Sequence, residues 1–110
     1  MRRITLPYYS KEDNEEISKI AHYLEPNEEV VIVAKGSKII FLTNKRLLMR
    51  KLSILKRETI LDLSYDKIIS TELKKGFRSS KILISTSRSE IEIDSLKKEV
   101  AERELDYLKQ

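Results

Sequence analysis

The sequence predicts a mainly β (α+β) domain: a seven-stranded antiparallel barrel or orthogonal sandwich with a C-terminal amphipathic helix and an extra N-terminal helix. Three observations support this fold class. Apolar and polar residues alternate with a period of two in short segments over residues 28–94. A helical period occurs only before and after that region. Every connection is short enough to join neighbouring antiparallel strands, so we expect one domain over residues 10–110.

The N-terminal part is predicted to be an irregular arm over residues 1–9 followed by a helix over residues 10–25. Pro7 keeps the arm out of the helix, and Ser10 is the expected N-cap. Pro26 ends the helix, because the residue before a proline is disfavoured in the α conformation. The apolar face of this helix consists of Ile17, Ile20, Ala21 and Leu24.

The central region is predicted to form seven strands that are separated by turn residues. They cover residues 29–35, 38–43, 46–51, 56–64, 67–75, 79–86 and 90–94. Ser95 is then the expected cap of a helix over residues 96–109. The apolar face of this helix consists of Leu96, Val100, Ala101, Leu105 and Leu108. We expect the strands to curl into a barrel and the helix to cover one open end.

The composition excludes several kinds of enzyme. The chain has no Cys, one His and two Gly, so a thiol nucleophile, a disulfide and a cysteine metal site are impossible. His22 has no partner for a triad or a metal site, and Gly36 and Gly76 are too far apart for a phosphate-binding loop. We interpret the dispersed carboxylates of Asp62, Asp66 and Glu72 as solubilising groups. We therefore expect no enzymatic activity, cofactor, metal or small-molecule substrate.

The chain has no apolar run of signal-peptide or membrane-spanning length, which predicts a cytoplasmic protein. Peripheral attachment to the inner face of the membrane stays open. Lys and Glu are abundant whereas thermolabile residue types are scarce, a profile that favours a heat-adapted source.

The net charge of +4 is predicted to be unevenly distributed. In an antiparallel meander, the turns after strands one, three and five lie at one end. We call this the basic loop end, and its cations are Lys35, Lys38, Arg50, Lys51, Lys56, Arg57, Lys74, Lys75 and Arg78. The other turns mix cations with acids. The basic loop end is therefore the candidate anion-binding or lipid-binding site, with membrane headgroups as the first ligand.

The turn after the third strand also carries aliphatic residues between Lys51 and Lys56: Leu52, Ile54 and Leu55. They are candidates for a membrane-dipping loop or a subunit contact, unless they fold back onto the barrel. The alternative function is a scaffold domain that self-assembles or binds other proteins. An acidic protein is the alternative partner for the basic loop end. Nucleic acid is disfavoured, because few aromatic residues beyond Phe77 lie near the basic turns to stack on bases.

Several short motifs in sequence order carry a family resemblance. They are Tyr23-Leu24 before Glu28-Glu29-Val30, Leu42-Thr43-Asn44-Lys45-Arg46-Leu47, Tyr65 with Lys67 and Ile68, and Lys75-Gly76-Phe77. Together they resemble the prokaryotic pleckstrin-homology (PH) domains, in particular the small YokE-like type. Ser64 stands where that family usually has a proline. The resemblance implies a seven-stranded barrel without catalytic activity. It also implies a ligand mouth around the turns after strands one, three and six, which would add Arg88 to the basic residues.

The turn from Thr43 to Arg46 also has a structural interpretation. Thr43 is expected to hydrogen bond to the turn backbone, and Asn44 tolerates the positive φ of a tight hairpin. Lys45 and Arg46 are expected to keep the turn solvated.

Overall fold

The computed structural model describes residues 11–55 and 57–109. Its helices are α1 (Lys11–Ile20), the 3-10 turns η1 (Ala21–Tyr23) and η2 (Tyr65–Lys67), and α2 (Lys98–Leu108). Its strands are β1 (Val30–Lys35), β2 (Ile39–Thr43), β3 (Arg46–Leu52), β4 (Glu58–Ser64), β5 (Ile68–Lys75), β6 (Ser80–Thr86) and β7 (Glu90–Leu96). All seven predicted strands are confirmed. The predicted arm over residues 1–9 and the Ser10 cap lie outside the described residues.

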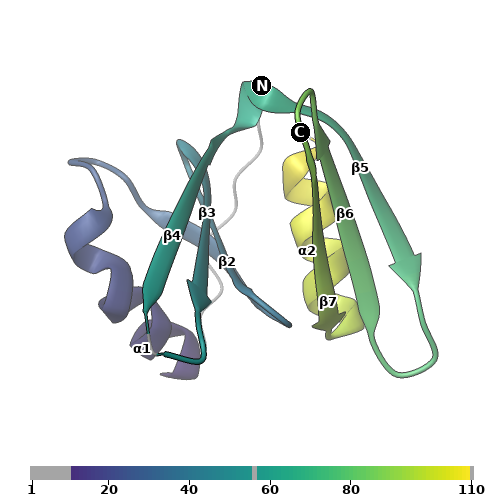
Figure 1. Ribbon diagram of the computed structural model, residues 1–110, viewed down its shortest axis with the longest axis horizontal. Coiled ribbons are helices and arrows are strands. Elements are labelled where there is room, and N and C mark those ends of the chain that lie inside the picture. Colours follow the sequence, from purple (N-terminus) through teal and green to yellow (C-terminus); the bar gives the residue numbers. More distant parts are fainter. Residues whose placement is uncertain (1–10, 56, 110) are drawn as a thin grey trace.

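The strands form two antiparallel sheets in sequence order, β1-β2-β3-β4 and β5-β6-β7. The turn η2 links them, and β4 and β5 diverge from it without pairing (Figure 1). The predicted barrel is therefore open along this side. Helix α2 lies between the two sheets and packs against β1, β5 and β6 (Figure 1).

The opposite side of the barrel is joined by a short seam between the β1–β2 turn and β7. The Ser37 N–H donates to the Asp94 carbonyl oxygen at 2.9 Å, and the Asp94 N–H donates to Ser37 Oγ at 3.1 Å. Gly36 permits this close approach, since a Cβ there would lie 2.0 Å from the Asp94 carbonyl oxygen. The glycine is therefore required by the packing of two backbones.

Strands β1 and β2 of the four-stranded sheet are buried on both faces, which explains their nearly continuous apolar runs. The inner face of this sheet joins β6, β7 and α2 in the main core, with Ile40, Leu42, Leu47, Ile82, Ile84, Ile93, Leu96 and Ala101. Its outer face packs against α1 in a second cluster of Ile20, Val30, Val33, Phe41 and Leu48. Helix α1 therefore serves as a cover for this sheet.

Both helix predictions need correction at their ends. The N-terminal helix stops at Ile20 and is followed by η1, after which Leu24 is already extended. Ser95 does not cap the C-terminal helix, because β7 continues to Leu96 and the N-cap is Lys97, which makes no side-chain cap bond. The strand continues because Leu96 is fully buried and pairs with Ser80. Within the described ranges, no helix is long and apolar enough to cross a membrane.

Candidate functional site

The turn between β2 and β3 is held by an ionic network around Arg46. Arg46 binds the Glu28 carboxylate in a bidentate manner, with Nε to Oε2 at 2.9 Å and Nη2 to Oε1 at 3.0 Å. It also forms an ion pair with Asp62 of β4 and lies 5.2 Å from the ring centroid of Tyr23. Thr43 Oγ1 donates to Glu28 Oε2 at 2.7 Å. One arginine therefore connects the segment before β1, the β2–β3 turn and β4.

The protonation of Glu28 reflects this network. Burial alone would raise the pKa of Glu28, but hydrogen bonds from Arg46, the Glu25 N–H and Thr43, together with the charge of Arg46, lower it to about 2. The expectation that Arg46 keeps the turn solvated is wrong, because only 12% of its side chain is exposed. This arginine has a structural role.

The other predictions for this turn have mixed outcomes. Thr43 Oγ1 accepts the N–H groups of Lys45 and Arg46, both at 3.0 Å, as expected. Asn44 does not adopt a positive φ; among the described non-glycine residues only Asn27 does. Asn44 instead accepts the Glu29 N–H at 2.8 Å and donates to the Asn27 carbonyl oxygen at 3.1 Å. The asparagine thus ties the turn to the segment before β1.

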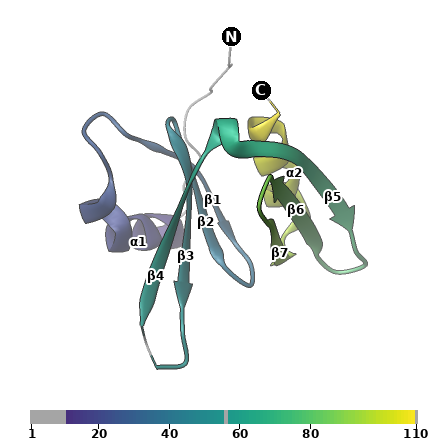
Figure 2. The same ribbon diagram turned by 45° about the horizontal axis from the view of Figure 1, so that its top comes forward.

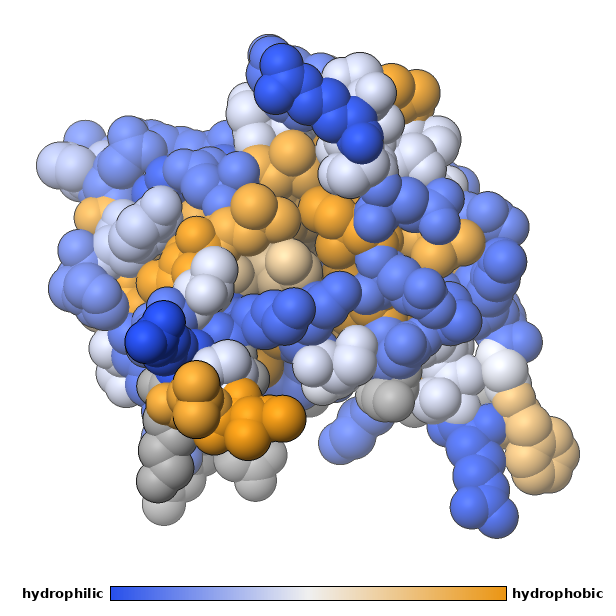
Figure 3. Space-filling view, viewed as in Figure 1, coloured by the Kyte–Doolittle hydropathy of each residue, from blue (hydrophilic) through white to orange (hydrophobic). Residues whose placement is uncertain are grey.

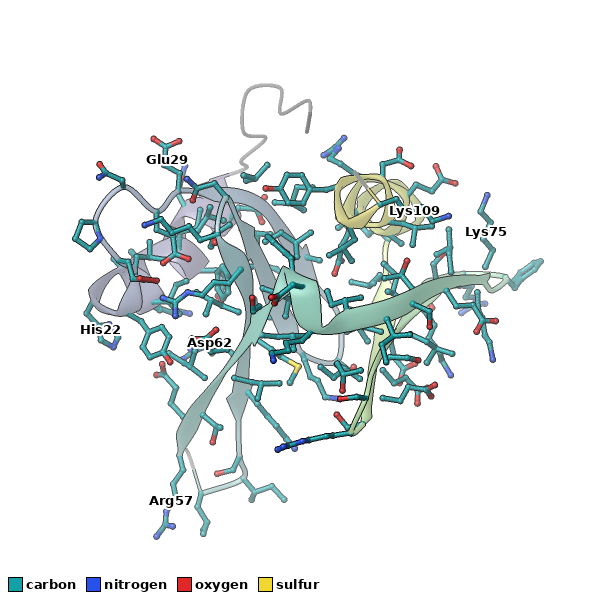
Figure 4. All side chains as sticks on the ribbon, turned by 90° about the horizontal axis from the view of Figure 1, so that it is seen from above. His22, Glu29, Arg57, Asp62, Lys75 and Lys109 are labelled. Carbon is teal, nitrogen blue, oxygen red and sulfur yellow. The ribbon has the colours of Figure 1, made fainter. Side chains whose placement is uncertain are left out.

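The turns after β1, β3 and β5 lie at the same end of the molecule, the lower end in Figure 1. They do not form one continuous patch. Arg57 beside the β3–β4 turn and Lys75 beside the β5–β6 turn lie on opposite sides of the molecule (Figure 4). The basic loop end therefore consists of two separate hairpin tips, with the β1–β2 turn between them (Figure 2).

The first of these, the β3–β4 tip, comprises residues 51–57. The side chain of Ile54 is 100% exposed and that of Leu55 is 77% exposed. Lys51 and Arg57 are exposed on either side, and apolar side chains protrude from the lower edge here (Figure 3). Ile54 and Leu55 do not fold back onto the barrel. Lys56 and the side chain of Leu52 lie outside what the structure describes.

The second, the β5–β6 tip, comprises residues 74–79. Lys74 and Arg78 are exposed, and Phe77 between them is 95% exposed. Lys75 forms an ion pair with Glu102 of α2 at 3.0 Å. Sequence reasoning considered Phe77 as a base-stacking residue and as part of a turn motif, and not as a surface contact. Its position directly after Gly76 in a basic turn was the signal that could have identified it as a surface contact.

Some of the predicted cations are engaged elsewhere. Arg50 is only 14% exposed and forms ion pairs with Glu16 of α1 at 3.9 Å and Glu58 of β4 at 3.5 Å. It therefore holds α1 on the sheet and is not free to meet a ligand. Lys38 Nζ donates to the Glu92 carbonyl oxygen of β7 at 3.1 Å, whereas Lys35 is exposed.

Arg88 does not join the basic loop end. It lies in the β6–β7 turn, which is at the other end of β6 from the β5–β6 tip (Figure 1). The seven residues of β6 separate the two turns by about 20 Å. The resemblance placed Arg88 with the turns after strands one and three, but the β6–β7 turn lies at the opposite end of the molecule from those turns (Figure 1).

A hollow of about 480 Å³ lies beside the β5–β6 tip and is lined by Lys74, Lys75, Gly76, Ser79, Ser80, Lys81 and Asp94. Lys81 forms ion pairs with Glu92 at 2.5 Å and Asp94 at 3.4 Å. Two of the three lysines around this hollow are thus neutralised by carboxylates, so it is not by itself an anion site. The described part of the chain contains no group of acidic or histidine side chains able to hold a metal ion.

A family model matches the chain, and solved structures show the same fold. The family model described as "Bacterial PH domain" matches residues 7–110. A solved pleckstrin homology domain from Shewanella amazonensis SB2B superposes with a TM-score of 0.71 at 14% identity, covering 87% of this chain and 97% of that one. A DUF1696 family protein with a pleckstrin-homology domain from Shewanella loihica PV-4 gives 0.66 at 14% identity, covering 88% and 96%.

No curated protein matches the sequence significantly. The finer assignment to the YokE-like type stays a prediction. The family model nevertheless spans nearly the whole chain, and the seven strands with their C-terminal helix are those of the solved PH domains. The chain belongs to the bacterial PH-domain family.

Proposed function

We propose that this domain is a non-enzymatic binding module that docks through its basic loop end onto anionic lipid headgroups at the inner face of the membrane. Its fold is that of a family that generally binds and does not catalyse. The observation that carries the proposal is the β3–β4 tip, where the fully exposed Ile54 and the exposed Leu55 lie between cations. Aliphatic side chains flanked by Lys and Arg suit the boundary between acyl chains and headgroups.

The available charge is sufficient for reversible attachment. Each Lys or Arg near an anionic membrane surface contributes about 1 kcal/mol. The exposed cations that support docking are Lys35, Lys51, Arg57, Lys74 and Arg78. Lys75 is also exposed, although it is paired with Glu102, and Lys38 is partly exposed. Lys56 is included on the basis of its position in the sequence alone. Arg50 is left out because it is committed to its two carboxylates.

The test is co-sedimentation with phosphatidylcholine vesicles that contain graded fractions of phosphatidylglycerol. We expect the bound fraction to rise with the anionic fraction and to fall at high salt, because screening weakens exposed charges. Neutral vesicles are the control. The absence of binding to strongly anionic vesicles at low salt would reject membrane docking.

A second candidate function, self-assembly or protein interaction, is favoured by the open side of the barrel. Strands β4 and β5 are the unpaired edges of their sheets, and Leu61 and Ile69 on them are 40% and 69% exposed. Exposed edge strands are surfaces on which a second chain can add a strand. The mass in solution tests this candidate: a concentration-dependent mass above 12.9 kDa would support it, and a constant monomer mass would exclude self-assembly.

A further inference from the structure

We infer that Phe77 is a second membrane anchor, so that the domain docks on an anionic bilayer through two separate hairpin tips. This inference rests on the proposed function and extends it from the β3–β4 tip to the β5–β6 tip. The two tips belong to different sheets. Each has an exposed apolar side chain at its turn and exposed cations beside it.

The local structure directs Phe77 away from the core. The turn is closed by a hydrogen bond from the Gly76 N–H to the Ser79 carbonyl oxygen at 2.8 Å. Gly76 lets these backbones approach, since a Cβ there would lie 2.6 Å from the Ser79 carbonyl oxygen. The Phe77 ring follows directly and is 95% exposed, so it contributes almost nothing to the packing of the domain. Single exposed apolar side chains are common on protein surfaces, so the ring is assigned as a contact because exposed cations lie beside it at the tip.

The charges around Phe77 favour a bilayer as its partner. Lys74 and Arg78 are exposed, and no ion pair within the described residues involves either of them. Two copies of this tip would place like charges opposite each other, which disfavours contact between identical tips. An anionic membrane instead offers headgroup charges to the cations and an acyl boundary to the ring.

The base of the hairpin is held by regular structure. Helix α2 packs against β5, and β5 pairs with β6 without interruption from Ser70 to Lys75. The position of Phe77 relative to the core is therefore set by regular structure.

The arrangement of the tips gives the second anchor a consequence for orientation. Both tips lie at the lower end in Figure 1, and Arg57 and Lys75 mark opposite sides of the molecule in Figure 4. One inserted tip would let the domain rotate on the surface. Two separated tips restrict that rotation and leave η2 and the end of α2 facing away from the membrane (Figure 1).

Single-tryptophan reporters test this inference, because the chain contains no Trp. Phe77→Trp and Ile54→Trp place one indole at each tip. Ser87→Trp is the matched control, since Ser87 is an exposed residue in the β6–β7 turn, at the other end of β6 from Phe77. With phosphatidylcholine/phosphatidylglycerol vesicles that carry brominated acyl chains, we expect a blue shift and quenching for Phe77→Trp and Ile54→Trp. We expect neither for Ser87→Trp.

The other outcomes separate this inference from the proposed function. A response at Ile54→Trp alone would overturn the second anchor and leave single-tip docking intact. Co-sedimentation without any response would mean docking by charge only, which also overturns the inference. No co-sedimentation would reject the proposed function itself. As an independent check, Phe77→Ser should weaken vesicle binding by about tenfold or more, the loss expected for one uninserted aromatic side chain. An unchanged affinity would contradict the inference.

Discussion

Arg46 and Arg57 both lie at hairpin turns of the same sheet, yet they have opposite environments. The guanidinium of Arg46 is bound by Glu28 and Asp62, and its side chain is 12% exposed. Arg57 is exposed, and among the described residues no ion pair involves it. The difference is in what surrounds each turn. Two other segments bring carboxylates to the β2–β3 turn, whereas the β3–β4 turn projects from the sheet.

The comparison shows that a basic turn is not by itself a binding site. The same residue type serves as a structural link where acids from other segments converge on it, and it is available to a ligand where none do. Arg50 is a third example, because carboxylates from α1 and β4 reach it and remove it from the basic loop end. The candidate surface is therefore defined by the cations that the fold leaves unneutralised.

The largest expected effect comes from removing the buried arginine. Arg46→Ala should destabilise the domain by about 3–5 kcal/mol, because it leaves the buried Glu28 carboxylate without its partner. Arg57→Ala is the matched control and should change stability by less than about 0.5 kcal/mol. Urea denaturation of the two variants measures the contrast. Equal effects would show that the two turns do not differ as described.

The pH dependence of folding stability distinguishes a buried carboxylate that has an ionic partner from one that has none. The pKa of Glu28 in the folded protein is lowered from 4.5 to about 2. Ionised Glu28 therefore stabilises the fold above pH 4.5, and this stabilisation is lost as the pH falls towards 2. The shift corresponds to about 3 kcal/mol. Glu28→Gln should lower the stability at neutral pH and flatten this acid limb in denaturation at several pH values. If Glu28→Gln loses stability at low pH as steeply as the wild type does, Glu28 is not the group responsible for that loss.

Glu104 of α2 should show the opposite slope. It is fully buried, its carboxylate oxygens accept no hydrogen bond from the described residues, and burial raises its pKa to about 8. The unfolded chain loses this proton near pH 4.5, so stability should fall as the pH rises from 4.5 to 8. Glu104→Gln should remove that decline. If Glu104→Gln still loses stability over this pH range, a group other than Glu104 causes the decline.

A smaller effect is expected at the seam between the β1–β2 turn and β7. Gly36→Ala brings a methyl group to within 2.0 Å of the Asp94 carbonyl oxygen, so the two backbones must separate. We expect a loss of about 1–3 kcal/mol in unfolding free energy, the range for overpacked sites. Lys35→Ala, next to it and exposed, is the control. If Gly36→Ala leaves the unfolding free energy unchanged, the contact between the β1–β2 turn and β7 contributes little to closing the barrel.

Much of the fold was predictable because it depends on local pattern. Alternation and turn residues located all seven strands, and the apolar faces located both helices. What could not be predicted depends on register between distant segments. Arg46 meets Glu28, 18 residues away, only after β1, β2 and β3 have paired. For the same reason the sequence could not reveal that Arg50 faces α1 or that the basic turns separate into two tips. The cap at Lys97 was missed because burial of Leu96 overrides the local preference for Ser95.

The most direct test of the account compares two charge reversals of equal size in vesicle co-sedimentation. Lys51→Glu/Arg57→Glu alters the β3–β4 tip, and Lys67→Glu/Arg88→Glu alters exposed cations in η2 and the β6–β7 turn. Each double variant lowers the formal net charge from +4 to 0, since every substitution removes two units. We predict that the first variant loses binding to anionic vesicles at low salt and that the second retains it. Equal losses would show that net charge alone governs the interaction and would contradict a defined docking end.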